Sequence, residues 1–323
     1  MDFKPIKLSA KWQTVISSII GERSQPSNTQ TQYLKLEDGD QLKLSISYAQ
    51  TTIQNITVVM FHGLSGDENS SYMVRIAKKL LNLGYHVVRV NHRGANKHLL
   101  PLARGIYHAG KSDDIYAVLK HLSLGDEHAQ LIPIGFSISG NMLLKALAEH
   151  SDNDLSIKHA IAIAPPMDLL ASMAKLSQKN NAIFNRHFAK RLYQLFKHRA
   201  ITHNHYQTFQ EKVATLPKNY GVYEIDEAFT AKEAGFVTAH EYYTHSSAKN
   251  YLSKIAYRTT ILCDHDDPFV DNRFAIGLSH TNIDIQWTHK GGHMGYLSRC
   301  KGWRPFEFWL DKKLISLIQN HKE

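Results

Sequence analysis

Short runs of mainly apolar residues alternate with amphipathic segments along the first half of the chain. The apolar runs are residues 56–61, 85–90, 131–136 and 159–164. Runs of this length and character are typical of strands that are buried on both faces of a parallel sheet. The segments between them carry apolar residues at helical spacing, and they are residues 71–83, 113–122 and 142–148. The alternation predicts an α/β fold with a mostly parallel sheet flanked by helices.

An Asp-Gly turn separates two strand-like segments near the N-terminus. Asp38-Gly39-Asp40 stands between residues 33–37 and residues 41–48, and the second segment alternates apolar with polar residues. This arrangement predicts a β-hairpin. The preceding stretch, residues 24–31, is rich in Ser, Gln, Asn and Thr, and we expect it to be a loop.

The alternation of strands and helices stops at residue 167 and resumes after residue 250. The stretch between is polar, basic and helical in pattern, and the later elements are strands 259–263 and 283–287 and a final helix, 306–318. We therefore predict a core made of residues 1–166 and 251–323. Residues 167–250 are predicted to form a helical cap inserted between two strands of the core.

Basic side chains interleave with aromatic and aliphatic ones in segment 183–199 of the predicted cap. The apolar residues at helical spacing are Phe184, Phe188, Leu192, Leu195 and Phe196, and the basic residues are Arg186, Lys190, Arg191, Lys197 and Arg199. Two interpretations are open. The basic face is either an ordinary solvated surface or a surface that makes transient contact with anionic lipid headgroups.

Composition narrows the class of protein. The chain has 323 residues, of which 43% are hydrophobic and 21% charged, and this suffices for one large α/β domain with an insertion. It has no apolar run of about 18 residues that predicts a membrane span, and no secretory signal is expected at its start. Cys263 and Cys300 form no disulfide framework. We therefore expect a cytoplasmic protein.

The formal net charge of +9 raises the question of nucleic-acid binding. The charges are spread along the chain and no nucleic-acid-binding motif accompanies them, so we do not expect a nucleic-acid partner. The 20 histidines are scattered and form none of the usual metal-ligand patterns. No metal site is therefore predicted.

A serine stands in a turn of small residues between a predicted strand and a predicted helix. The sequence is Gly135-Phe136-Ser137-Ile138-Ser139. The pattern is close to G-x-S-x-G, in which the serine occupies a strained elbow with its hydroxyl exposed at the end of the sheet. Ser139 replaces the second glycine. We predict Ser137 as a nucleophile if partners for it exist elsewhere in the chain.

An acidic loop and a histidine loop follow later strands, in the chain order Ser, Asp, His. His293 follows the last predicted strand and is the expected general base. Asp267 is the expected partner of this histidine, because Asp-Pro followed by two apolar residues is the usual setting of the acid in this architecture. Asp266 is the second choice, and Asp264 and Asp271 are further alternatives.

Two backbone amides are expected to stabilise the oxyanion of a tetrahedral intermediate. One is the amide of Ile138, directly after the predicted nucleophile, and the other is the amide of Leu64 in the loop after the first buried strand. That loop reads His62-Gly63-Leu64-Ser65-Gly66.

Several short motifs together resemble the YheT-like family of α/β hydrolases, which are bacterial relatives of the animal ABHD lipid hydrolases. They are Phe3-x-Pro5, Gln13-Thr14, the loop from His62 to Gly66, Asn91-x-Arg93-Gly94, Tyr107-His108-Ala109-Gly110, Gly140-Asn141, Asp226-x-x-Phe229-Thr230-Ala231, Tyr242-Tyr243, Asp266-Asp267-Pro268-Phe269 and Gly291-Gly292-His293-x-Gly295-Tyr296. The resemblance implies an α/β-hydrolase fold with a helical cap, a Ser-Asp-His triad at Ser137, Asp267 and His293, and no cofactor. The family usually has glycine where this chain has Ser139.

The sequence thus predicts a serine hydrolase that cleaves carboxylic esters through an acyl-enzyme. The expected substrates are small-molecule esters of short or medium acyl chains, or lipid esters. Three alternatives remain: the same three residues acting on a thioester, an amide or a carbon–carbon bond; a degenerate hydrolase that serves as a binding module; and a protein that acts at a lipid surface through its basic cap.

Overall fold

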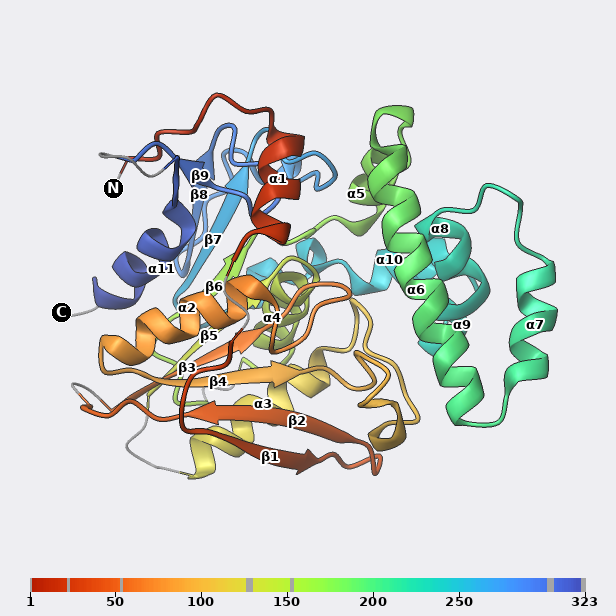
Figure 1. Ribbon diagram of the computed structural model, residues 1–323, viewed down its shortest axis with the longest axis horizontal. Helices are drawn as coiled ribbons and strands as arrows, with labels where there is room; N and C mark the ends of the chain where they lie inside the picture. The colour runs from red at the N-terminus through yellow and green to blue at the C-terminus, as the bar shows by residue number, and fades with distance from the viewer. Residues whose placement is uncertain are drawn as a thin grey trace.

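An eight-stranded sheet forms the centre of the molecule (Figure 1). The computed structural model describes residues 2–21, 24–52, 55–125, 130–151, 154–300 and 305–320, so both outer bounds of the predicted core, 1 and 323, lie outside it. The sheet order is β1-β2-β4-β3-β5-β6-β7-β8. The strands are β1 (Thr29–Lys35), β2 (Gln41–Ser47), β3 (Ile56–Phe61), β4 (His86–Asn91), β5 (Gln130–Phe136), β6 (Ala160–Ile163), β7 (Thr259–Asp264) and β8 (Ile283–Thr288).

In sheet order, the strands β4-β3-β5-β6-β7-β8 are parallel to one another, whereas the edge formed by β1 and β2 is antiparallel. The β1–β2 hairpin is antiparallel, and β2 also pairs antiparallel with β4. The predicted hairpin and mostly parallel sheet are confirmed. The boundary of the first strand is not, because β1 begins at Thr29 inside the stretch predicted to be a loop. Thr29 pairs with Ser47, and their hydroxyls lie 2.8 Å apart, so pairing with β2 outweighs the local composition.

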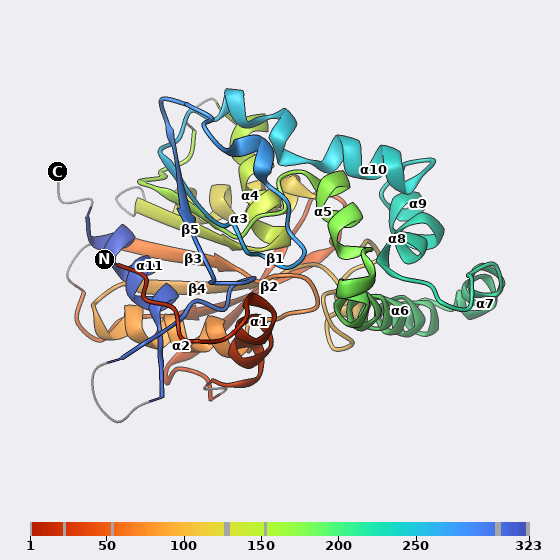
Figure 2. The same cartoon turned by 90° about the horizontal axis from the view of Figure 1, so that it is seen from above.

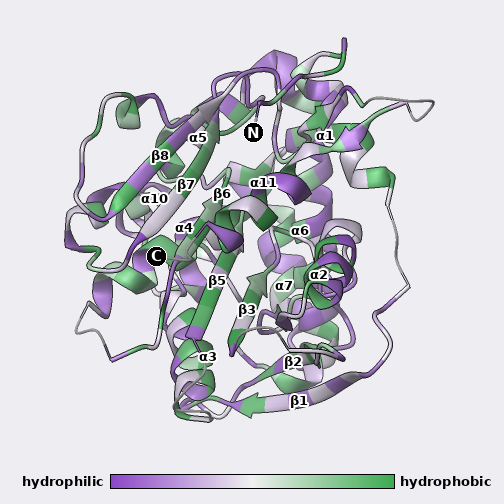
Figure 3. Ribbon diagram, turned by 90° about the vertical axis from the view of Figure 1, so that its left-hand side faces the viewer, coloured by the Kyte–Doolittle hydropathy of each residue, from purple (hydrophilic) through white to green (hydrophobic). Residues whose placement is uncertain are grey.

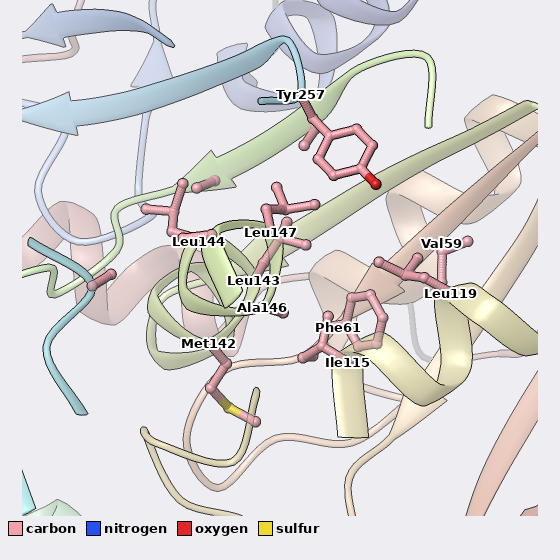
Figure 4. Packing of buried hydrophobic residues seen from close by; sticks show 14 of the residues in the cluster. Val59, Phe61, Ile115, Leu119, Met142, Leu143, Leu144, Ala146, Leu147 and Tyr257 are labelled. Carbon is pink, nitrogen blue, oxygen red and sulfur yellow. The ribbon is translucent and has the colours of Figure 1, made fainter. Parts of the chain in front are cut away.

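Helices cover both faces of the sheet. On one face α3 (Ser112–Gly125) and α4 (Ile138–Glu149) pack on the strands. Figure 4 shows this packing, with Ile115 and Leu119 of α3 beside Phe61 of β3. On the other face lie α2 (Ser71–Asn82) and α11 (Trp309–Gln319). Because both faces are covered, the central strands are hydrophobic along nearly their whole length (Figure 3).

A helical insertion separates β6 from β7, as predicted. It projects from one side of the sheet in both Figure 1 and Figure 2. Its elements are α5 (Leu169–Leu176), η2 (Lys179–Asn181), α6 (Ala182–Thr202), α7 (Tyr206–Ala214), α8 (Val222–Ile225), the π-helix η3 (Asp226–Thr230), α9 (Ala231–Glu233), α10 (Ala239–Ser246) and η4 (Ala248–Asn250). The insertion has an aromatic core of its own, in which the rings of Phe196 and Phe229 stack at 5.0 Å. That residues 167–250 form a distinct unit stays a prediction.

Three elements near the chain ends were not predicted. They are α1 (Ala10–Ile19) and a small antiparallel pair, β9 (Leu297–Ser298) with β10 (Glu307–Phe308). β10 occupies the start of the stretch predicted to be the final helix, so α11 begins at Trp309. Within the described ranges, none of the helices combines the length and the apolar character needed to cross a membrane.

Candidate active site

Ser137 lies in the one-residue turn between β5 and α4. Its backbone has φ 53° and ψ −120°, a conformation that L-residues rarely adopt. The turn is tight enough that a Cβ on Gly135 would lie 2.4 Å from the carbonyl oxygen of Ser139, so only glycine fits at position 135. This strained turn holds the Ser137 hydroxyl at the carboxyl edge of the sheet.

The hydroxyl of Ser137 faces His293, which follows β8. The distance from Ser137 Oγ to His293 Nε2 is 2.8 Å. On the other side of the ring, His293 Nδ1 lies 2.7 Å from Oδ2 of Asp267, in the loop after β7. The histidine and the aspartate are both buried. The structure therefore brings the three residues into one hydrogen-bonded row, although they lie far apart in the sequence.

The acidic loop after β7 gives each carboxylate a different partner. Asp267 Oδ1 accepts hydrogen bonds from the amides of Phe269 and Val270, at 3.0 and 2.9 Å, which fixes its other oxygen toward His293. Asp266, the second choice, instead accepts from the backbone N–H of Lys290 at 2.8 Å.

The two further alternatives also have other partners. Asp264 accepts from the hydroxyl of Thr288 and the amide of Gly291, at 2.7 and 2.8 Å, and Asp271 pairs with Arg273 at 2.7 Å. Burial raises the pKa of Asp264. Of the four aspartates, Asp267 is therefore the one that contacts the imidazole.

Helix α1 holds the loop that carries His293, which the sequence did not indicate. The backbone N–H of His293 donates to Thr14 Oγ1 at 2.9 Å. Gln13 accepts from the amide of Leu297 at 2.8 Å and donates to the carbonyl of Lys290. Gln13-Thr14 is one of the motifs behind the family resemblance, so the sequence marked these two residues but did not indicate that they contact the His293 loop.

Gly292, directly before His293, packs closely against α1. Gly292 has φ +63°, and a Cβ there would lie 2.2 Å from the carbonyl oxygen of Ala10 in α1. The glycine is therefore required by close packing against α1, and the loop is fixed rather than free.

The two residues predicted to supply the oxyanion donors, Leu64 and Ile138, line the same cavity as Ser137. Ile138 is the first residue of α4, where an amide has no acceptor within its own helix. In the loop after β3, the amides of Gly63 and Ser65 donate to the hydroxyls of Tyr72 and Tyr107, both at 2.9 Å. The amide of Leu64 lies between these two, and within the described part of the chain it has no acceptor.

A buried chain of polar side chains supports the loop after β3. Ser139 Oγ donates to the carbonyl of His62 and lies 2.7 Å from His92 Nε2. Because the serine proton goes to the carbonyl, His92 must carry its own proton on Nε2. Burial lowers the pKa of His62 and of His92, so both rings are neutral near pH 7. Ser139, which departs from the family pattern, therefore both donates and accepts a buried hydrogen bond in this chain.

A cavity of about 720 Å³ opens above Ser137. The α/β core contributes Leu64, Ile138 and His293 to its walls, and the helical insertion contributes Met173, Phe188 and Leu192. Most of these side chains are apolar, so the cavity suits an acyl chain next to the serine hydroxyl.

The wall of the cavity formed by the insertion also includes a buried carboxyl group. Asp226 of η3 accepts from the hydroxyls of Thr230 and Tyr243, at 2.5 and 2.6 Å. Burial raises the pKa of Asp226 to about 6, against the lowering effect of these two hydrogen bonds. His108, on the same cavity, is half-buried, and desolvation of its ring lowers its pKa to about 3. Among the described residues, no group of three or more His, Cys, Asp or Glu could hold a metal ion.

Comparison with known proteins places the chain in a family. Residues 56–295 match the family model described as the alpha/beta hydrolase fold. YheT of Escherichia coli (strain K12) is 30% identical over 302 residues, which cover 90% of this chain and 85% of that protein. The "Medium-chain fatty acid ethyl ester synthase/esterase 2" of Saccharomyces cerevisiae is 26% identical over 264 residues, covering 75% of this chain and 58% of that protein.

A solved structure agrees with the fold. The esterase EaEST from Exiguobacterium antarcticum superimposes with a TM-score of 0.51 over 91% of this chain and 100% of its own, at 17% sequence identity. The predicted fold and the resemblance to the YheT-like proteins are confirmed by these matches. The chain belongs to the alpha/beta hydrolase family.

Proposed function

We propose that this protein is a serine hydrolase that cleaves carboxylic esters through an acyl-enzyme. The observation that carries the proposal is the hydrogen-bonded row Ser137–His293–Asp267 at the base of a mainly apolar cavity. The family adds support, since this alpha/beta hydrolase has relatives that include a protein named as an esterase of medium-chain fatty acid ethyl esters.

In the first half of the reaction, Ser137 Oγ attacks the ester carbonyl carbon while His293 Nε2 takes the hydroxyl proton. Asp267 accepts the hydrogen bond from His293 Nδ1, so it fixes the tautomer and stabilises the imidazolium that forms. The carbonyl oxygen becomes an oxyanion, and the amides of Leu64 and Ile138 donate to it. When the intermediate collapses, His293 returns the proton to the leaving alcohol.

In the second half, a water molecule attacks the acyl-enzyme, again with His293 as the base. The acid is released and the Ser137 hydroxyl is restored. No cofactor takes part in this scheme. The cap, residues 167–250, would act as the wall that shields the acyl chain from water.

The substrate class follows from the lining of the cavity. Met173, Phe188 and Leu192 suit an aliphatic acyl chain, and a volume of about 720 Å³ admits a short or medium chain or the ester region of a lipid. A thioester or an amide would meet the same row of residues. A panel of nitrophenyl esters of rising chain length, run beside the matching thioesters and anilides, separates these bonds.

The test of the nucleophile uses a fluorophosphonate probe. The wild-type protein should be labelled, whereas Ser137→Ala should neither be labelled nor hydrolyse nitrophenyl esters. Asp267→Asn should lower kcat by roughly 10³–10⁴-fold, because the histidine loses its orienting carboxylate. Asp266→Asn is the matched control and should retain nearly full kcat. Labelling of the Ser137→Ala protein, or a wild type that is folded but inert to the probe, would contradict the proposal and favour a binding module.

A further inference from the structure

Helix α1 has its polar and apolar faces reversed. Its two buried side chains are Gln13 and Thr14, whereas Trp12 is 60% exposed and Ile19 65% exposed. A helix that packs on a protein core normally buries its apolar face. Trp12, Ile16 and Ile19 recur at helical spacing, so they form one stripe along α1, in which Trp12 and Ile19 are exposed and Ile16 is half-buried. An exposed apolar stripe of this kind indicates a binding surface.

The apolar stripe lies at the mouth of the cavity above Ser137. Ser18 of α1 and His187 of α6 both line that cavity, so its opening is bounded by these two helices. Lys11 donates to the carbonyl of Asn180 in η2, which joins α1 to the start of α6, and Figures 1 and 2 both show this neighbourhood. Ile183 in the first turn of α6 is 85% exposed and extends the apolar surface on the far side of the opening.

The helices at this opening carry charges of one sign, whereas the loop after β3 contributes Asp67 to the cavity wall. The sequences of α1, η2 and α6 contain no Asp or Glu, and their basic residues are Lys11, Lys179, Arg186, Lys190, Arg191, Lys197 and Arg199. Three of these bond to other parts of the chain: Lys11 and Arg191 donate to the carbonyls of Asn180 and Ser65, and Arg199 pairs with Glu233 at 3.2 Å. Lys179, Arg186 and Lys190 lie on η2 and the first half of α6, near Ile183. Cations together with an exposed tryptophan are the composition of surfaces that lie on anionic membranes.

We infer that α1 and the start of α6 form a docking surface for anionic phospholipid. In this arrangement Trp12, Ile19 and Ile183 enter the interface, the lysines and arginines contact the headgroups, and the cavity opens directly onto the lipid. A second copy of the chain fits less well, because a symmetric contact would bring the basic helices of the two copies together. The inference rests on the proposed function only in that the lipid surface supplies the ester.

The buried face of α1 explains why the helix stays in place with its apolar side outward. Thr14 and Gln13 are bonded to the loop of His293, so the outer stripe has a fixed position relative to the Ser137 hydroxyl. Docking of the stripe therefore aims the cavity at the membrane. It should change access to a lipid-borne ester and leave the chemistry on a dissolved ester unaltered.

The binding test uses the full-length Ser137→Ala protein, so that it does not depend on catalysis. Co-sedimentation with phosphatidylcholine vesicles that contain phosphatidylglycerol is compared with that on phosphatidylcholine alone. We expect binding to the anionic vesicles that weakens as salt is added. Adding Trp12→Ser and Ile19→Ser should weaken it by roughly tenfold for each side chain removed from the interface. Leu124→Ser is the matched control, because Leu124 is 74% exposed at the end of α3 and lies outside the proposed surface.

The activity test uses the same substitutions in the active protein. Trp12→Ser with Ile19→Ser should lower hydrolysis of an ester carried in anionic vesicles and leave that of a dissolved nitrophenyl ester unchanged. Equal vesicle binding by the substituted and control proteins would overturn the inference, and so would equal binding to neutral and anionic vesicles. A dimer that becomes a monomer on substitution would also overturn it, since the stripe would then join two copies. Hydrolysis of the dissolved ester without vesicle binding would contradict the docking surface and leave the proposed function intact. Vesicle binding without any hydrolysis would contradict the proposed function and leave the docking surface intact.

Discussion

The hydroxyl of Ser139 connects two buried histidines, and its removal should be costly. Ser139 is 0% exposed, and its Oγ bonds both the carbonyl of His62 and the ring of His92. Ser139→Ala keeps the size of the side chain nearly constant but leaves a buried acceptor and a buried donor without partners. Each such group costs about 1–3 kcal/mol, so the free energy of unfolding should fall by about 2–6 kcal/mol.

Urea unfolding followed by circular dichroism measures this loss. Ser123→Ala is the control, because Ser123 accepts one longer bond, 3.2 Å from the amide of Ser156, at a partly buried site. Its removal should cost only about 1 kcal/mol. His92→Phe completes a double-mutant cycle with Ser139→Ala, since a phenyl ring preserves the stacking of His92 on Tyr107 at 5.2 Å. The cycle should give a coupling energy of about 1–2 kcal/mol.

Ser139→Ala should also affect catalysis, through the loop after β3 that carries the proposed oxyanion donor Leu64. The carbonyl that Ser139 holds belongs to His62, two residues before the Leu64 amide, so a loosened loop misplaces that donor. Ser139→Ala should therefore lower kcat, by roughly 10-fold or more, with little change in KM. Additive effects in the cycle, together with wild-type stability of Ser139→Ala, would refute the account of Ser139 as a structural connection.

Two further predictions concern Thr14 and Asp226. Thr14→Val removes the acceptor of the His293 amide without changing side-chain shape. The kcat on a dissolved nitrophenyl ester should fall roughly tenfold, because the unsatisfied buried amide loosens the loop. A wild-type kcat would show that α1 does not hold the histidine. Asp226 has its pKa raised from 3.8 to about 6 by burial, so the folded protein gains stability from the protonated form below about pH 4 and loses it as pH rises through about 6. The unfolding free energy of Asp226→Asn minus that of wild type should therefore rise by about 3 kcal/mol as the pH increases from about 4 to about 8. Urea midpoints that differ by the same amount at every pH would contradict the raised pKa.

Local pattern was sufficient for the sheet and for the row of residues at its edge. Strands β3 and β5 are buried on both faces, so they carry uninterrupted apolar runs that stand out in the sequence. Ser137 and Asp267 each follow a buried strand, β5 and β7, and His293 follows the partly exposed edge strand β8 within a few residues. Since parallel strands end at one edge, their order along the chain was enough to bring them together. The choice between Asp266 and Asp267 required coordinates, because one step along a loop reverses the direction of a side chain.

The contacts of Ser139 lay beyond sequence reasoning for a different reason. Its partners, His62 and His92, follow two other strands and are neighbours only because β3 lies between β4 and β5 in the sheet. Strand order is a property of the whole fold, and no local spacing encodes it. A family pattern that has glycine at position 139 therefore does not reveal which groups a serine there would contact.

Helix α1 shows why an apolar stripe in a sequence does not reveal the direction in which it faces. The loop after β8 has positive φ at Lys290, Gly292 and Met294, so its backbone groups cannot pair with one another as in a helix or a strand. Side-chain oxygens must supply the missing acceptors, and Gln13 and Thr14 do so for the amides of this loop. Once the polar side of α1 is committed to the loop, its apolar side can only face outward. The exposed stripe at the cavity mouth is thus a consequence of how the catalytic loop satisfies its own backbone.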